Sequence, residues 1–353
     1  MTLQDLGYHS ALDKYIEENN ICSLIIGRVV SEHKERYVVK TPDTDYEAEI
    51  LGNLRFSAQS RTDFPAVGDW VAMAEYDKNK ALIHHVLPRK TIIERQAVGK
   101  KGEKQIIATN IDCAFIVQAV DRDFNINRIE RYLAICNSAG VEPIIILNKI
   151  DLLDNDSINT IVRSIKSRIK NIAVYAISNQ SQEGIDQLKA NIEKGKTYCL
   201  LGSSGVGKSS LLNTLLGKEF MQTDTISTST NKGRHVTTHR ELQVLDNGGI
   251  IIDNPGMREV GIADAANGLE TTFDQLLVLA EECRFANCTH TTEKGCAIIE
   301  AVKNGTIDQM MYDNYLKLQR EQQHYESTIA ERRQKKKELG KLIKQYKKIK
   351  GIN

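Results

Sequence analysis

Residues 202–209 read Gly202-Ser203-Ser204-Gly205-Val206-Gly207-Lys208-Ser209 and lie between an apolar run, residues 198–201, and the helix-like residues 210–216. This order of strand, glycine loop and helix start is typical of a phosphate-binding P-loop, because glycines let successive N–H groups point at one anion. Lys208 would reach the β- and γ-phosphates, and the Ser209 hydroxyl would coordinate Mg²⁺. These eight residues and Ser210 are the expected phosphate contacts. The alternative is a glycine-rich turn before an ordinary helix.

Length and composition limit the classes of protein. The 353 residues are enough for two or three domains. No apolar run approaches the 18 residues that would cross a bilayer, and the N-terminus has no hydrophobic stretch for export, so we expect a soluble, cytoplasmic protein without membrane association. The net charge is +1, yet residues 331–350 carry ten Lys or Arg against two Glu. A basic tail on a mildly acidic body suggests a polyanionic partner, with a solvated charged helix as the alternative.

Residues 21–95 contain about five short β-rich runs with turn signals between them. At this size the pattern predicts an oligonucleotide-binding (OB) barrel, and a β-domain used only for packing is the alternative. Aromatic side chains beside basic ones could stack on RNA bases. The candidates for such a face are Arg28, Lys34, Arg36, Arg55 and Arg61, with Tyr37 or Phe56.

From residue 106 onward, apolar strand-like runs alternate with helical segments, which predicts a parallel α/β sheet. Asn148-Lys149-Ile150-Asp151 follows the buried run of residues 143–147 and matches the pattern NKxD. The Asp151 carboxylate can accept from N1–H and N2–H of guanine, whereas adenine would leave it unpaired. Ser178 follows the next strand, where guanine-binding folds often have a serine-led loop. A plain turn explains Ser178 nearly as well.

Two further elements follow the P-loop. Thr237, with Thr238 as second choice, lies in a polar segment where a threonine could coordinate Mg²⁺ only while the γ-phosphate is present. The alternative is a solvated loop. A predicted hairpin then ends in Asp253-Asn254-Pro255-Gly256, the DxxG pattern. Asp253 would support Mg²⁺ through water, and the Gly256 N–H would sense the γ-phosphate.

The order of these motifs is unusual. A Ras-like GTPase runs from P-loop to switch threonine, DxxG, NKxD and serine loop, whereas here NKxD and the serine loop precede the P-loop. This is a circular permutation, which leaves the chemistry possible because the loops need only meet in space. The second switch then leads directly into the C-terminal segment.

Four soft ligands lie close together in that segment: Cys283, Cys288, His290 and Cys296. Their spacing in a chain expected in a reducing compartment suits one closed, structural Zn²⁺ site, with buried free cysteines as the alternative. Residues 306–339 contain neither Pro nor Gly, so a long helix or helical pair is expected there.

Taken together, the permuted motif order, the preceding OB-like domain, the Gly233–His239 switch segment (residues 233–239) and the cysteine cluster resemble the ribosome small-subunit-dependent GTPase A family (RsgA, also called YjeQ or YloQ). The resemblance covers essentially the whole chain. It implies a GTPase that binds GTP and GDP, acts on the 30S subunit and its 16S rRNA late in maturation, and turns over slowly until that subunit accelerates it. It also implies rRNA contacts by the OB and zinc domains.

Two positions depart from expected patterns. Met257 follows DxxG where Ras-like enzymes have the glutamine that orients the attacking water. The family is similar in lacking that glutamine, and the switch-loop residue that matches its catalytic histidine is His235. A neutral imidazole could orient water or accept its proton. Val236 stands where many family members have threonine, so Mg²⁺ coordination depends on Thr237.

The sequence therefore predicts a multidomain α/β protein, expected to be a monomer. An N-terminal extension with an OB barrel occupies residues 1–100, a circularly permuted GTPase domain residues 101–265, and a helical zinc-binding domain residues 266–353. In this hydrolase Lys208 would stabilise phosphate charge, and Asn148, Lys149 and Asp151 would form the guanine pocket. One rival function is a GTP-gated RNA-binding module with incidental hydrolysis. A second is a small-molecule kinase, and the NKxD and DxxG motifs argue against it.

Overall fold

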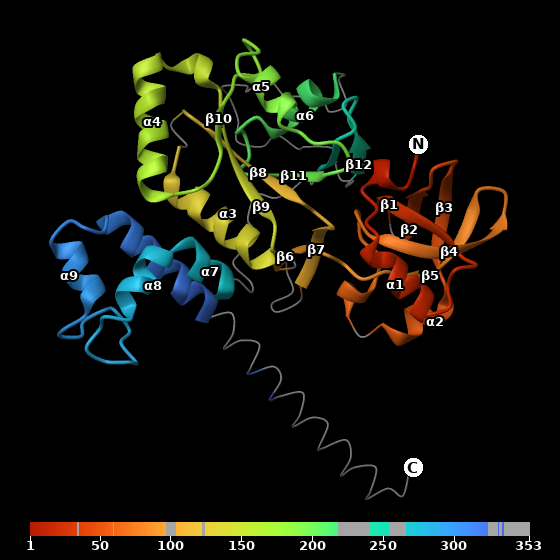
Figure 1. Cartoon of the computed structure of the whole chain (residues 1–353), viewed down its shortest axis with the longest axis horizontal. Helices are drawn as coiled ribbons and strands as arrows, with labels where there is room; N and C mark the ends of the chain where they lie inside the picture. Colours follow the sequence, from red (N-terminus) through yellow and green to blue (C-terminus); the bar gives the residue numbers. More distant parts are fainter. Residues whose placement is uncertain are drawn as a thin grey trace, which may run out of the picture.

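The computed structural model describes residues 1–33, 35–58, 60–96, 104–121, 124–217, 241–253 and 266–323, together with residues 331 and 334. Within these ranges the chain forms a small β-barrel, a mixed sheet covered by helices, and a helical C-terminal part (Figure 1). No helix among the described residues is long and apolar enough to cross a membrane.

Five strands close the barrel in the order β1-β2-β3-β5-β4, and β4 pairs back onto β1. All neighbours are antiparallel except β3 and β5, which are parallel. This confirms the predicted OB-like barrel, since every strand edge inside it is paired. The strands are β1 (Ile25–His33), β2 (Arg36–Lys40), β3 (Asp45–Ile50), β4 (Trp70–Asp77) and β5 (Lys80–Val86).

Alternating side chains fill the barrel. In β3 the residues Tyr46, Ala48 and Ile50 are buried while the acidic residues between them are exposed, as the period of two in a strand requires. A short helix, α2 (Gly52–Ser57), and the 3₁₀ turn η2 (Arg61–Asp63) connect β3 to β4. The barrel thus has its own apolar core.

The N-terminal segment seals one side of the barrel. It contains the 3₁₀ turn η1 (Gln4–Leu6) and the helix α1 (Ala11–Glu18). Leu6 and Leu12 pack with Trp70 and Leu87 in a separate apolar cluster, and the ring of Tyr8 meets Trp70 edge-on at 5.0 Å. The sequence did not predict this role, because the contacts join residues far apart in the chain.

The second sheet has the order β10-β9-β8-β11-β13-β12. All neighbours are parallel except the edge strand β12, which forms an antiparallel hairpin with β13. This confirms the predicted parallel α/β sheet and the hairpin. The strands are β8 (Cys113–Ala119), β9 (Glu142–Asn148), β10 (Val174–Ala176), β11 (Thr197–Leu201), β12 (Glu241–Val244) and β13 (Ile250–Asp253).

Helices cover both faces of this sheet, as Figure 1 shows. Ala114 and Ile116 of β8 pack into the cluster that includes α3 (Ile126–Ala139) and α4 (Asn155–Arg168). Phe115 and Val117 point to the opposite face, where α5 (Ile185–Ala190) and α6 (Lys208–Leu216) lie. A strand buried on both faces explains why its sequence is continuously apolar.

A small hairpin connects the two sheets. It consists of β6 (Ile92–Gln96) and β7 (Lys104–Thr109), which pair antiparallel across the expected domain boundary at residues 100/101. The barrel also touches the second sheet directly, because Ser31 of β1 pairs with Glu241 of β12. The two sheets therefore form one continuous hydrogen-bonded surface.

Arg28 lies at this junction, and the prediction that it belongs to an exposed RNA-binding face is wrong. Its side chain is 1% exposed. The guanidinium donates to the carbonyls of Leu6 (2.5 Å), Asn110 (3.1 Å) and Gly68 (3.2 Å) and to Thr197 Oγ1 (2.9 Å). Arg28 thus ties the N-terminal segment and the barrel to the start of β11.

The other residues predicted for that RNA-binding face differ in their exposure. Tyr37 is buried in the barrel core, whereas Phe56 is 93% exposed. Arg36, Arg55 and Arg61 are exposed, and the first two form ion pairs with Glu49 and Glu35 respectively. Lys34 lies outside the described residues.

The C-terminal part packs on α3 (Figure 1). It contains α7 (Ala266–Thr272), α8 (Asp274–Ala280), α9 (Ala297–Lys303) and a helical stretch, residues 309–323. The buried Glu130 of α3 accepts from Arg168 of α4 at 2.7 Å and from Asn314 at 2.6 Å. Arg131 forms a two-bond ion pair with Glu321, both bonds being 2.7 Å long. The basic residues 335–350 lie outside the described residues.

Candidate nucleotide site and metal centre

The glycine loop joins β11 to α6, as predicted. Gly202 and Gly207 have φ angles of 151° and 93°, which side chains rarely adopt. A Cβ atom on Gly202 would lie 2.3 Å from the carbonyl oxygen of Val117, and one on Gly207 would lie 2.2 Å from Asn148 Nδ2. Val206 is 1% exposed and anchors the loop in the core. Both glycines are therefore required by the backbone path and by close neighbours.

Lys208 begins α6, and its ammonium group bends back over the loop. Nζ donates to the carbonyls of Gly202 at 2.8 Å and Ser203 at 2.5 Å. Ser209 and Ser210 follow in the first turn of the helix. The positive charge and the helix N-terminus thus act at one place, which is an arrangement that favours a bound phosphate.

Asn148 ends β9 and reaches the glycine loop. It is 1% exposed, and its Nδ2 donates to the carbonyl of Val206 at 2.8 Å. The next residue, Lys149, has a left-handed backbone with φ 65°, and its Nζ forms a 2.9 Å ion pair with Asp121, which follows β8. The NKxD segment is therefore fixed to the loops at the ends of two neighbouring strands.

Asp151 lies in the 3₁₀ turn η3 (Ile150–Leu152) and meets the serine-led loop. Ser178 Oγ donates to Asp151 Oδ1 at 2.5 Å. Ser178 Oγ also accepts from the backbone N–H groups of Ser181 at 3.0 Å and Gln180 at 3.1 Å, in its own loop. Ser178 itself is fully buried. The structure thus brings Asn148, Asp151, Ser178 and the glycine loop together.

Asp253 ends β13 beside the glycine loop. The register of β11 and β13 pairs Cys199 with Ile252, so Asp253 and Gly202 stand at the same edge of the sheet. Asp253 is 9% exposed. The predicted residues His235, Thr237 and Gly256, and also Met257, lie outside the described residues.

Sequence reasoning missed two residues of this site. Asp121 pairs with Lys149, and Asn179 donates to Asn148 Oδ1 at 3.2 Å. The position of Asp121 directly after a buried strand was the available signal, because parallel strands bring their carboxyl ends to one edge. Asn179 stands in the predicted serine-led loop, but that pattern indicates no role for its side chain.

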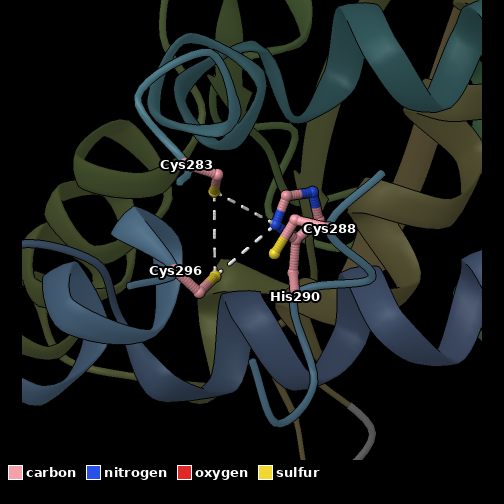
Figure 2. A group of neighbouring side chains, drawn as sticks. All are labelled: Cys283, Cys288, His290 and Cys296. Carbon is pink, nitrogen blue, oxygen red and sulfur yellow. Dashed lines mark hydrogen bonds between the residues drawn. The ribbon is translucent and has the colours of Figure 1, made fainter. Parts of the chain in front are cut away.

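The second site is formed by the four predicted zinc ligands (Figure 2). Cys283 follows α8, Cys288 and His290 lie in the next loop, and Cys296 precedes α9. Their ligand atoms all lie within 4.8 Å of one another. His290 Nδ1 is 3.6 Å from Cys283 Sγ and 3.5 Å from Cys296 Sγ, and the two sulfurs are 3.9 Å apart.

These separations fit a tetrahedral metal. Bonds of about 2.3 Å to sulfur and about 2.0 Å to nitrogen place the ligand atoms of a tetrahedral Zn²⁺ roughly 3.5–3.8 Å apart. Burial lowers the pKa of His290, which favours the neutral imidazole that a metal needs. The cysteines are all free thiols. The cluster can therefore hold a metal ion after small movements of its side chains.

Glu293 shapes the loop that carries His290. Its carboxylate accepts from the backbone N–H groups of Thr289, Thr291 and Thr292 at 2.9–3.0 Å and from the Thr289 hydroxyl. Tyr312 of the following helix donates to the carbonyl of His290. Such bonds behind the ligands fix the ligands' orientation.

Comparison with known families gives two matches. The model described as RsgA GTPase matches residues 86–263, which is half of the chain. A model described as ABC transporter matches residues 185–347, which is less than half. That second range includes the glycine loop, an element that many nucleotide-binding proteins share, so it does not assign a family.

Curated relatives match over most of the chain. The small ribosomal subunit biogenesis GTPase RsgA 1 of Bacteroides thetaiotaomicron is 41% identical over 92% of this chain and 91% of its own length. The RsgA protein of Methanosarcina acetivorans is 38% identical over 93% of this chain and 89% of its own.

Among solved structures, YjeQ from Thermotoga maritima has a TM-score of 0.60 at 27% identity and covers 83% of this chain and 96% of its own. YloQ, titled a circularly permuted GTPase, has a TM-score of 0.61 at 22% identity and shares the fold. That match covers 83% of this chain and 93% of the YloQ chain. The permuted order of NKxD, serine loop and glycine loop in this chain agrees with that title. The chain therefore belongs to the RsgA GTPase family and is a GTP hydrolase.

Proposed function

We propose that this protein hydrolyses GTP while bound to the small ribosomal subunit during the assembly of that subunit. The observation that carries the nucleotide part is the contact of three loops: Asn148 with the glycine loop, and Asp151 with Ser178. The partner is inferred from the relatives, which are named small ribosomal subunit biogenesis GTPases. Both inferences agree with the resemblance in the motifs.

In this proposal the base is selected by Asp151. Its carboxylate accepts from two N–H groups of guanine, and Ser178 holds one of its oxygens in place. Asn148 and Lys149 brace the pocket from the end of β9. Adenine offers no matching pair of donors, so an adenine nucleotide would leave the carboxylate without them.

Hydrolysis joins a water oxygen to the γ-phosphorus and breaks that atom's bond to the bridging oxygen, which leaves GDP and phosphate. Lys208 and the N–H groups of residues 202–209 stabilise the charge that develops on the phosphate oxygens. Ser209 and Thr237 would hold Mg²⁺, and Asp253 would support it through water. When bound there, Mg²⁺ would supply positive charge against the phosphate oxygens. His235 is the proposed residue that orients the water.

The cysteine cluster is proposed to hold one structural Zn²⁺. Four protein ligands leave no open position for substrate, which is typical of structural sites. The cluster lies between α8 and α9, far in sequence from the glycine loop, and its neighbours Leu276, Ile298 and Met311 form the core of the C-terminal part. The metal would therefore stabilise that part rather than act in hydrolysis.

We also propose how the parts divide the work. The barrel, the zinc-binding part and the basic residues 331–350 would contact 16S rRNA, and residues 101–265 would act as the GTPase domain, with division points at 100/101 and 265/266. The exposed Phe56 and Arg55 on α2 support the barrel's contribution. A cytoplasmic monomer is the corresponding cellular form.

Sedimentation of the purified chain with ribosomal subunits tests the partner. We expect the protein to pellet with 30S subunits in the presence of a non-hydrolysable GTP analogue and to remain in the supernatant with 50S subunits. Equal pelleting with both subunits, or with neither, would contradict the proposed partner. Varying the salt concentration separates specific binding from general attraction to RNA.

A further inference from the structure

Asn179 lies where the three loops of the nucleotide site meet, and it stands in the serine-led loop, where no role is predicted for its side chain. It follows Ser178 in the loop after β10. Its Nδ2 donates to Asn148 Oδ1 at 3.2 Å and approaches the carbonyl oxygen of Gly207 at 3.5 Å. One side chain thus touches both the NKxD segment and the glycine loop.

The contact fixes the orientation of Asn148. The Asn148 amide donates from Nδ2 to Val206 and accepts at Oδ1 from Asn179, so both of its ends have a partner. An Nδ2 group carries two hydrogens, and the bond to Val206 uses one of them. The other hydrogen is available to an acceptor on a purine ring, such as N7. A flipped Asn148 amide would present an oxygen there instead.

The orientation of Asn179 follows from the same network. If its amide were reversed, its oxygen would face two other oxygens, Asn148 Oδ1 and the carbonyl of Gly207. In the observed orientation Asn179 Oδ1 is buried and has no hydrogen-bond partner among the residues that the structure describes. An unpaired buried acceptor disfavours the folded state, so packing alone does not account for an amide at this position.

The backbone of Asn179 is held as well. Its carbonyl oxygen accepts from Gln182 Nε2 at 2.6 Å. The side chain therefore projects from a turn whose backbone carbonyl is hydrogen-bonded.

We propose that Asn179 is a positioning residue for guanine-nucleotide binding: it locks the Asn148 amide in the orientation that donates to the base. The inference rests on the proposed guanine site and adds a residue that acts on it through Asn148. Asn179 acts through Asn148, which faces the base, and it approaches the glycine loop at the carbonyl oxygen of Gly207 and not at a phosphate-binding N–H group. We therefore expect it to affect GDP and GTP equally and to leave the chemical step unchanged.

Two variants of the full-length protein test this role. Asn179→Ala removes the donor to Asn148. Asn179→Asp keeps the size but places a carboxylate against Asn148 Oδ1, which forces the Asn148 amide to turn. Gln180→Ala is the matched control, since Gln180 is the exposed neighbour in the same loop. The measurements are the dissociation constants of fluorescent GDP and a GTP analogue, kcat at saturating GTP, and the melting temperature of the nucleotide-free protein.

We expect Asn179→Ala to weaken GDP and GTP binding alike by about five- to ten-fold, the loss of roughly one hydrogen bond. Asn179→Asp should weaken binding further, while kcat at saturating GTP and the Gln180→Ala control stay at wild-type values. Both Asn179 variants leave a buried polar atom of Asn148 without a partner, so their melting temperatures should fall by a few degrees while the protein stays folded at the assay temperature. If Asn179 only filled space, Asn179→Ala would weaken nucleotide binding more than Asn179→Asp, because Asp has the same shape as Asn and Ala does not. If Asn179→Asp weakened GTP binding more than GDP binding, the added negative charge, and not a turned Asn148 amide, would explain the effect.

Either of those results, or unchanged affinity in both variants, would overturn the role of Asn179. Nucleotide binding by the wild-type protein distinguishes failure of this positioning role from failure of the proposed guanine site. If wild type binds guanine nucleotides and the variants do so equally well, the guanine site stands and only the positioning role fails. If wild type binds no guanine nucleotide, the proposed site itself is wrong.

Discussion

Ser178 donates its hydroxyl hydrogen to Asp151 Oδ1 across 27 residues of sequence. The serine is fully buried, whereas Asp151 is exposed on the 3₁₀ turn that follows β9. A buried donor therefore orients an exposed acceptor within the protein itself. Pre-orientation of this kind reduces the entropy that is lost on binding.

The contact leads to a prediction for base choice. Asp151→Asn should change the preferred base from guanine to xanthine, because an amide presents one acceptor and one donor where the carboxylate presents two acceptors. We expect GTP affinity to fall by at least about 100-fold. Competition between GTP and XTP for the same fluorescent nucleotide measures the change. Asp156→Asn, an exposed substitution in the first turn of α4, is the control. A variant that still selects GTP over XTP contradicts the guanine pocket.

A second prediction concerns the phosphate charge. Lys208→Ala removes the ammonium group that bends over the glycine loop, and turnover should fall by at least about 100-fold because the transition-state charge loses its main counter-charge. Phosphate release from GTP is the measurement. Lys166→Ala, on the exposed side of α4, should retain wild-type turnover. Unchanged turnover in Lys208→Ala would remove the glycine loop from the mechanism.

The cysteine cluster predicts a metal content. We expect about one zinc per chain by elemental analysis, and Cys288→Ser should lower both the zinc content and the melting temperature. Acid should release the metal, because thiolates and the imidazole bind protons in competition with it. Cys22→Ser changes an exposed thiol in the N-terminal segment and should alter neither quantity. Full zinc content in Cys288→Ser would show that this thiol is not a ligand.

A further prediction concerns the contribution of Arg28 to protein stability, away from the nucleotide site and the cysteine cluster. Burial lowers the pKa of Arg28 to about 10, so the guanidinium remains charged at neutral pH. Arg28→Met would leave the acceptors of four chain segments without this donor and should reduce the free energy of unfolding by about 3 kcal/mol or more. Urea denaturation measures the loss. Arg36→Met removes only an exposed ion pair and should change stability by less than about 1 kcal/mol. Equal effects of the two substitutions would contradict the proposed role of the junction.

Local patterns predicted most of the fold. Short β-rich runs separated by turn signals predicted the barrel strands, and continuous apolar runs predicted β8, β9 and β11. Each of these signals is contained in a few neighbouring residues. The glycine loop, NKxD and the cysteine cluster were found for the same reason. Spacing along the chain was enough in each case.

Contacts between distant residues were not predictable in this way. Arg28 looked like a surface cation, yet it meets Thr197, 169 positions away. Glu130 carries no sequence signal for a tertiary role, but it accepts from Asn314, 184 positions away. Asn179 stands in the serine-led loop, yet the role of its side chain depends on where β9, β10 and β11 end in space. In each case tertiary packing decided the environment, which composition and periodicity do not report.

The most direct test of the central claim is steady-state GTP hydrolysis by the purified protein alone, with 30S subunits and with 50S subunits, using ATP as the control nucleotide. We predict slow hydrolysis of GTP by the protein alone, a large increase with 30S subunits only, and no hydrolysis of ATP under any condition. A rate that is the same with and without 30S subunits would leave a GTPase whose partner is not the small subunit. Hydrolysis of ATP as fast as GTP would contradict the guanine site that Asp151 and Ser178 form.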